Sequence, residues 1–180
     1  MGRDNSPRER QKRKLERKAG RRASYDRILI VTEGSVTEPY YFREIRSTFR
    51  LQTANVQVLP GGDGTAPVQV VNYAERLFLQ GSIEKNIVER AFEKVYVVFD
   101  RDEHPSYIDA LRKVESINRK HKNDEGKRVD FIAVASVPCF EIWFLLHFEN
   151  MYAFTDRNDI FAHLVRHIPG YLKGSKGMFA

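Results

Sequence analysis

Short apolar or alternating runs separate longer amphipathic segments along this chain. Four runs predict strands, at 28–32, 55–59, 95–99 and 130–135. Apolar residues at helical spacing predict helices over 38–49, 67–79 and 107–122, another that starts at Pro138 in the apolar segment 136–148, and a last one over 156–167. This order predicts an α/β fold with a mostly parallel four-stranded sheet, helices on both of its faces, and further helices at the C-terminal end.

Acidic residues follow two of the predicted strands directly. Asp100 and Asp102 end the run Val95–Phe99, and Glu33 and Glu38 follow the run that ends at Thr32. The carboxyl ends of parallel strands meet at one edge of a sheet, where open α/β folds bind ligands. Like charges held this close need a cation or a proton between them, and Mg²⁺ prefers oxygen ligands. The alternative is that Asp100 and Asp102 only end a strand and begin a turn.

A third acid, Glu141, stands in the apolar segment 136–148. Burying a carboxylate is costly unless it is paired or ligates a metal, so Glu141 is a candidate metal ligand or an orienter of a basic group. A glutamate in the first turn of a helix, favoured by the helix dipole, is the alternative. Lys173 and Lys176, which stand near small residues, suit a phosphate contact, although surface lysines are commonly just solvated.

Charge divides the chain into a basic arm, residues 1–24, and one domain, residues 25–180. The net charge is +6, and residues 1–22 carry ten basic and three acidic side chains. This arm has few aliphatic residues and is expected to be disordered when free. Either it is solvated without a specific partner, or it contacts nucleic-acid phosphates. The candidate phosphate contacts of the arm are Arg10, Arg13, Lys14, Arg17 and Arg21.

Other classes of protein are disfavoured. No apolar run is long enough to span a membrane, and the single cysteine, Cys139, is expected to be buried in a cytoplasmic protein. The five histidines lack zinc-binding spacing, and no hydrolase triad motif is present. The glycines between Gly61 and Gly64 match no nucleotide-binding motif, so an ordinary turn is the better interpretation there.

Three sequence blocks together resemble a known family. They are Val31-Thr32-Glu33-Gly34 with Thr37-Glu38, Phe99-Asp100-Arg101-Asp102, and Pro138-Cys139-Phe140-Glu141-Ile142-Trp143. The first two blocks resemble the Toprim fold of topoisomerases, primases and OLD-type nucleases. All three in this order look like the RloB family, which is found with restriction and abortive-infection loci. The resemblance runs from about Arg27 to Lys173.

The resemblance implies a Toprim-like, Rossmann-like domain with a metal site. Glu33 would act as general acid or base, Asp100 and Asp102 would bind Mg²⁺ or Mn²⁺, Glu38 would also serve a metal, and Lys173 would serve the phosphate. The implied activity is Mg²⁺-dependent cleavage of DNA or RNA in phage defence, with an ATPase partner and an oligomer as further expectations. Metal-assisted cleavage does need a polarised phosphate and a base near a water. The alternative is a non-cleaving nucleic-acid-binding or regulatory subunit.

Overall fold

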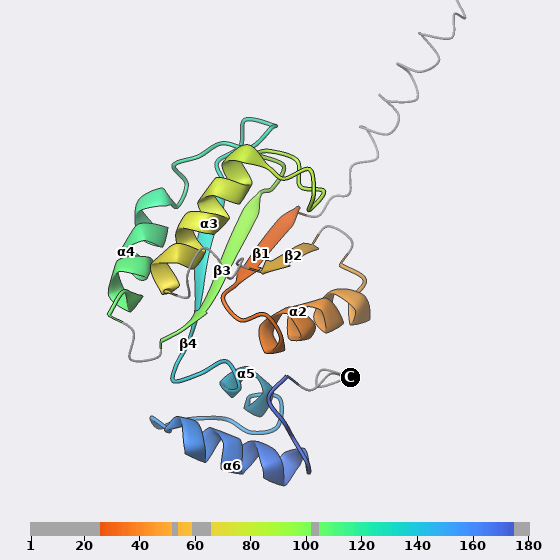
Figure 1. Cartoon of the computed structure of the whole chain (residues 1–180), viewed down its shortest axis with the longest axis vertical. Coiled ribbons are helices and arrows are strands. Elements are labelled where there is room, and N and C mark those ends of the chain that lie inside the picture. Colours follow the sequence, from red (N-terminus) through yellow and green to blue (C-terminus); the bar gives the residue numbers. More distant parts are fainter. Residues whose placement is uncertain (1–25, 52–53, 59–65, 102–104, 175–180) are drawn as a thin grey trace, which may run out of the picture.

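The computed structural model describes residues 26–51, 66–101 and 105–174, together with the backbone of 54–58. Its centre is a sheet of β1 (Ile28–Thr32), β2 (Ala54–Val58), β3 (Lys94–Asp100) and β4 (Asp130–Ser136). The strands lie in the order β2-β1-β3-β4, and every neighbouring pair is parallel (Figure 1). The predicted α/β class with parallel strands is therefore confirmed.

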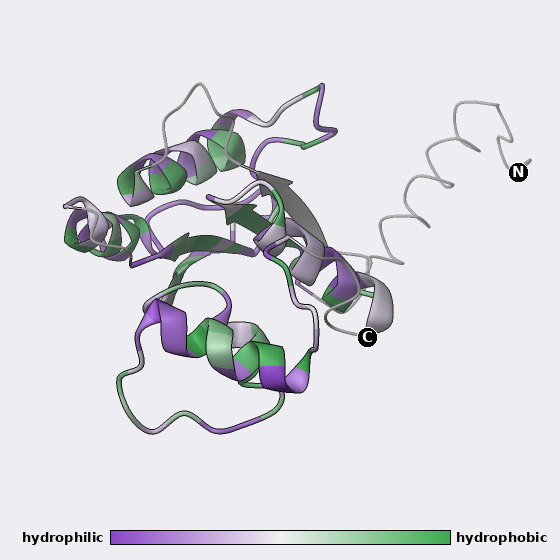
Figure 2. Cartoon of the chain, turned by 60° about the horizontal axis from the view of Figure 1, so that its bottom comes forward, coloured by the Kyte–Doolittle hydropathy of each residue, from purple (hydrophilic) through white to green (hydrophobic). Residues whose placement is uncertain are grey.

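Five helices accompany the sheet in the described part of the chain: α2 (Thr37–Thr48), α3 (Pro67–Gln80), α4 (Tyr107–Ile117), α5 (Ile142–Leu145) and α6 (Arg157–His167). The strand side chains alternate between two buried clusters. In β3, Val95, Val97 and Phe99 join the cluster built with α3 and α4, whereas Val98 joins the cluster that includes residues of α2, α5 and α6. Helices thus lie on both sides of a largely hydrophobic sheet (Figure 2).

The helix α5 (four residues) is much shorter than the helix that was predicted to start at Pro138 and run through the apolar segment that ends at residue 148. Strand β4 continues through Ser136, and the backbone then makes tight turns, with the N–H of Ile142 donating to the carbonyl of Cys139 and that of Trp143 to Phe140. The segment is apolar on all sides because it packs within the core, and the indole N–H of Trp143 donates to the Ser136 hydroxyl at 3.1 Å. The apolar character of this segment therefore indicates burial and does not indicate a long helix.

Two other helix ends test the sequence reasoning. Helix α6 begins as predicted, because the Asp156 side chain accepts a hydrogen bond from the Asp159 N–H at 2.9 Å. Helix α4 was predicted to reach residue 122 but ends at Ile117. Asn118 leaves the helical conformation, and its side-chain oxygen accepts from the Phe131 N–H at 3.2 Å, which ties this end of the helix to β4.

Within the residues that are described, no helix is both long enough and apolar enough to cross a bilayer. The short helix α5 and the helix α6 lie beyond the carboxyl ends of the strands (Figure 1). They therefore cover the edge of the sheet where the sequence predicted the site.

Candidate metal centre

The structure brings the ends of β1 and β3 together at this edge. Thr32 pairs with Val98, and the N–H of Glu33 donates to the Val98 carbonyl at 3.1 Å. Asp100 is the last residue of β3 and pairs with Ser136 of β4. Both acids are partly buried, and the Oδ1 atom of Asp100 is fully buried. Asp102, the other half of the predicted metal-binding pair, lies outside the described residues.

Glu38 projects from the first turn of α2 back onto the loop that follows β1. A methyl group at Gly34 would lie 2.1 Å from the Oε2 atom of Glu38, so only glycine leaves room for this carboxylate. Burial raises the pKa of Glu38, and the charge of Glu141 raises it further. The backbone amides of Glu38 and Gly34 and the ammonium of Lys173 act against this shift. Glu38 is thus a carboxylate held among charges of both signs.

Among the described acids of the candidate site, Glu141 is the least exposed. It lies directly before α5, and only 1% of its surface is exposed. Neither carboxylate oxygen has a hydrogen-bond partner among the described residues, and its side chain does not cap α5. Glu141 does stand at the start of α5, where the alternative of a glutamate favoured by the helix dipole places it, but its side chain makes no capping hydrogen bond. A carboxylate buried without hydrogen bonds is costly and points to a ligand.

Lys173 supplies the nearest positive charge to Glu141. Its Nζ atom lies 4.0 Å from Glu141 Oε1, while 63% of the lysine side chain is exposed. The next residue, Gly174, has φ +84, and a methyl group there would lie 2.8 Å from Val36 Cγ1. The C-terminal segment therefore passes closely over the turn between β1 and α2. This crossing places the largely exposed lysine beside Glu141.

The charge of Glu141 also acts on two residues that the sequence did not assign to the site. Cys139 is fully buried, as predicted, and burial together with the charge of Glu141 raises its pKa to about 12. Tyr171 is buried, and burial followed by the charges of Glu141, Cys139 and Glu38 raises its pKa. The spacing Cys139-x-Glu141 is visible in the sequence, whereas nothing in the sequence pairs Tyr171 with that segment.

The predicted acids do not all meet in one preformed cluster. In the described part of the chain, no three of Glu33, Glu38, Asp100 and Glu141 bring ligand atoms within 4.8 Å of one another. The structure instead gives two neighbouring sets, Glu33 with Asp100 at the strand ends, and Glu38 with Glu141 and Lys173 beside them. A divalent ion shared by these sets would need rotation of the carboxylates or a ligand from Asp102.

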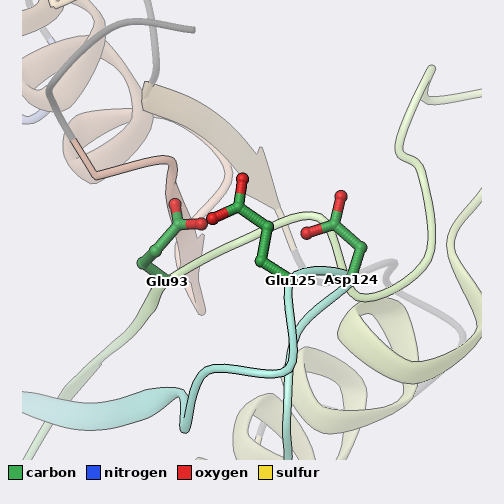
Figure 3. A group of neighbouring side chains, drawn as sticks. All are labelled: Glu93, Asp124 and Glu125. Carbon is green, nitrogen blue, oxygen red and sulfur yellow. The ribbon is translucent and has the colours of Figure 1, made fainter. Parts of the chain in front are cut away.

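A different group of acids does bring its ligand atoms within 4.8 Å of one another. Glu93, Asp124 and Glu125 have carboxylate oxygens within 4.8 Å of one another, close enough to hold a metal ion (Figure 3). Glu93 directly precedes β3, so this cluster lies at the opposite, amino edge of the sheet. Sequence reasoning missed it because its members are distant in the chain and follow no strand end.

Arg27 already balances the charge of this second cluster. The Arg27 guanidinium donates to Asp124 Oδ2 at 2.9 Å and to Glu93 Oε1 at 3.0 Å. The hydrogen bond to Asp124 has the largest effect on the pKa of Arg27, and together with the hydrogen bond to Glu93 it raises that pKa. Asn123 donates to the same Glu93 oxygen at 2.9 Å. The cluster therefore works as an anchor that ties the loop before β4 to the starts of β1 and β3.

The predicted phosphate contacts of the basic arm fall outside the described residues, as does Lys176. The outlying residues are Arg10, Arg13, Lys14, Arg17, Arg21 and Lys176. Their assignment stays a prediction.

Comparison with known proteins gives one match. The family described as RloB-like protein matches residues 28–180 of this chain. No curated protein and no solved structure matches it. The matched residues include every candidate site residue of the folded part.

Proposed function

The chain belongs to the RloB-like protein family, and from this premise we propose that it is a metal-dependent nuclease. The observation that carries the proposal is Glu141, a carboxylate 1% exposed and without a hydrogen-bond partner among the described residues. It lies at the carboxyl edge of a parallel sheet, beside Glu38 and Lys173. A buried anion of this kind fits a cation that is supplied from outside the chain.

The donor atoms suit Mg²⁺ or Mn²⁺ better than a softer metal. The carboxylates are hard oxygen ligands, and the thiol of Cys139 has a pKa raised to about 12 and so stays protonated near neutral pH. The residues proposed to hold the ion are Glu38, Asp100, Asp102 and Glu141. When bound, the ion supplies polarisation of the phosphate and acidification of a water.

The remaining roles in the proposed reaction are assigned to side chains of the protein and not to the ion. Glu33, on the turn that follows β1, would accept or return a proton at the attacking water. Lys173, largely exposed beside Glu141, would contact the phosphate as a mobile point charge. This arrangement supports a Toprim-like site, because the acid-bearing ends of β1 and β3 lie side by side.

The partners and the biological setting are proposals that come from the family resemblance. We propose nucleic acid as the substrate, the arm over residues 1–24 as its electrostatic contact, and a role in phage defence. An ATPase partner is proposed because the sequence carries no nucleotide-binding motif of its own. Neither DNA nor RNA is favoured by any described contact.

The test is metal-dependent cleavage by the purified protein. Single- and double-stranded DNA and RNA are incubated with Mg²⁺, Mn²⁺ or chelator, and the wild type is compared with Asp100→Asn and Glu141→Gln. Asp109→Asn is the matched control, because Asp109 is an exposed acid of α4 that pairs with Arg112 at 3.9 Å. Cleavage that needs metal, disappears in both site variants and persists in the control supports the proposal.

Two other results would contradict it. Cleavage that survives in Asp100→Asn and Glu141→Gln would place the activity elsewhere or in a contaminant. Tight nucleic-acid binding with no cleavage of any substrate, with or without metal, would favour the alternative of a non-cleaving subunit.

A further inference from the structure

Arg101 is a charged residue at the candidate site that the proposed chemistry has not used. It follows Asp100 directly in the chain, and its side chain is exposed. Its backbone N–H donates to the Ser136 carbonyl at 2.8 Å, so the ladder between β3 and β4 continues for one residue past Asp100. The arginine side chain therefore starts from a fixed point of the backbone at the carboxyl edge of the sheet.

The alternation of strand side chains directs Arg101 to the opposite side of the sheet from Asp100. In β3, Phe99 belongs to the cluster built with α3 and α4, and Val98 belongs to the cluster on the other side. Because side chains alternate along a strand, Asp100 shares the side of Val98, and Arg101 shares the side of Phe99. Arg101 is thus a neighbour of a proposed metal ligand along the backbone, but its side chain leaves the opposite face.

An aromatic ring restrains the guanidinium on that face. The Cζ atom of Arg101 lies 6.0 Å from the centroid of the Tyr107 ring, which is a cation–π distance. Tyr107 is the first residue of α4, and its ring meets the ring of Phe99 edge to face, with centroids 6.0 Å apart. A cation–π contact acts through the charge of the guanidinium and leaves its N–H donors available for an acceptor.

No acid balances this cation within the part of the chain that the structure describes. There, no carboxylate forms an ion pair with Arg101, whereas Arg27, Arg112 and Arg119 each pair with one. A restrained, exposed guanidinium without an acid partner is suited to an anion that comes from outside the chain. Its planar fork matches two oxygens of a phosphate group in a bidentate contact.

We propose that Arg101 binds the phosphate of the nucleic acid that neighbours the one to be cleaved. This inference rests on the proposed function, because it assigns Arg101 to the substrate of the same site. The two faces of the sheet edge then have separate tasks. The acids on the side of Asp100 hold the ion, and Arg101 on the other side holds the neighbouring phosphate. A guanidinium aimed at the acids would instead neutralise the charge that the ion needs.

The experiment measures nucleic-acid affinity separately from cleavage. Fluorescein-labelled DNA and RNA, single- and double-stranded, are titrated with the full chain in chelator, and fluorescence anisotropy gives the affinity at several salt concentrations. Arg101→Gln removes the charge, and Arg101→Lys keeps the charge but loses the planar fork. Arg112→Gln is the matched control, because the side chain of Arg112 is 76% exposed and already pairs with Asp109.

Arg101→Gln is expected to weaken nucleic-acid binding about tenfold at low salt, because a charge-assisted contact to phosphate is lost. The slope of log affinity against log salt concentration should become shallower by about 0.7–0.9, the contribution of one phosphate contact. Arg101→Lys should restore this slope but only part of the affinity, and Arg112→Gln should behave as the wild type.

Three further readouts distinguish a phosphate contact from a structural or metal-binding role. The melting temperature and the Mn²⁺ affinity, measured by electron paramagnetic resonance of the free ion, should be unchanged in Arg101→Gln, because this side chain leaves the opposite face from Asp100. In metal-dependent cleavage, Arg101→Gln should raise KM and leave kcat nearly unchanged, since a neighbouring phosphate is held equally in the ground state and the transition state.

The outcomes separate this inference from the proposed function. If Arg101→Gln binds nucleic acid with the affinity and salt slope of the wild type, the inference is wrong and the metal-dependent function stands. A fall in kcat with unchanged KM would also overturn it, because Arg101 would then act on the reacting phosphate itself. If the wild type cuts no substrate but Arg101→Gln loses affinity as expected, the nuclease function fails and the phosphate contact remains.

Discussion

Replacing Glu141 by glutamine should stabilise the metal-free protein. The substitution keeps the shape of the side chain and removes one negative charge from a position that is 1% exposed. Neither oxygen of Glu141 has a hydrogen bond within the described residues, so the change removes no hydrogen bond to them. A metal ligand often costs the fold stability when its ion is absent, and Glu141 fits that pattern.

The magnitude follows from two opposing effects. Lys173, at 4.0 Å, would attract Glu141 by about 4 kcal/mol at an effective dielectric constant of about 20. Because 63% of the Lys173 side chain is exposed, water screens this attraction to about 1 kcal/mol. Removing the carboxylate from water costs several kcal/mol, so a net gain of roughly 1–3 kcal/mol remains for the Glu141→Gln variant.

The assay is thermal unfolding in chelator and again in excess Mg²⁺. For a protein of this size the gain corresponds to a melting temperature roughly 2–12 °C higher in chelator. Saturating metal should reverse the order, because ion at about 1,000 times its dissociation constant stabilises the wild type by about 4.1 kcal/mol, which exceeds the gain of the variant. Glu115→Gln on α4, an exposed acid, is the control and should change stability by less than about 0.5 kcal/mol.

A Glu141→Gln variant that melts several degrees lower in chelator would refute this reasoning. It would show that the carboxylate holds the fold through a protein partner. The buried charge would then be structural, and the observation that carries the proposed function would be lost.

Three further predictions concern other parts of the site and the arm. Glu38→Gln should stabilise the metal-free protein at pH 7.5, because burial raises the pKa of Glu38 above its ordinary value of 4.5. Ionisation of Glu38 therefore costs the folded protein stability as the pH rises through the folded-state pKa. Urea unfolding at several pH values should show that the gain vanishes below about pH 4, where Glu38 is protonated in both the folded and the unfolded state. Gly34→Ala should displace the Glu38 carboxylate, which lies 2.1 Å from the new methyl position, and calorimetry should show weaker Mn²⁺ binding with a nearly unchanged melting temperature in chelator. Deleting residues 1–22 should leave the melting temperature unchanged and flatten the salt dependence of nucleic-acid affinity, whereas an unchanged slope would mean that binding uses the folded surface.

Local pattern was enough to predict the order of the elements and the parallel sheet. Apolar strand runs such as Val95–Phe99 and the alternation of strands with amphipathic segments are properties of neighbouring residues. The rule that parallel strands share a carboxyl edge then predicted that Glu33 and Asp100 lie on adjacent strand ends, as the pairing of β1 with β3 places them. The family could also be predicted, because its three blocks are short and contiguous in the chain.

The surroundings of each acid were decided only by tertiary structure. Burial of Glu141 depends on how the turn before α5 packs, and the 4.0 Å approach of Lys173 depends on the C-terminal segment crossing the β1–α2 turn. Likewise, Arg27 pairs with acids of the cluster formed by Glu93, Asp124 and Glu125, and Glu125 lies 98 positions after Arg27 in the chain. Desolvation and charge pairing act between groups that are close in space, so no spacing in the sequence could reveal that burial and the charge of Glu141 raise the pKa of Tyr171.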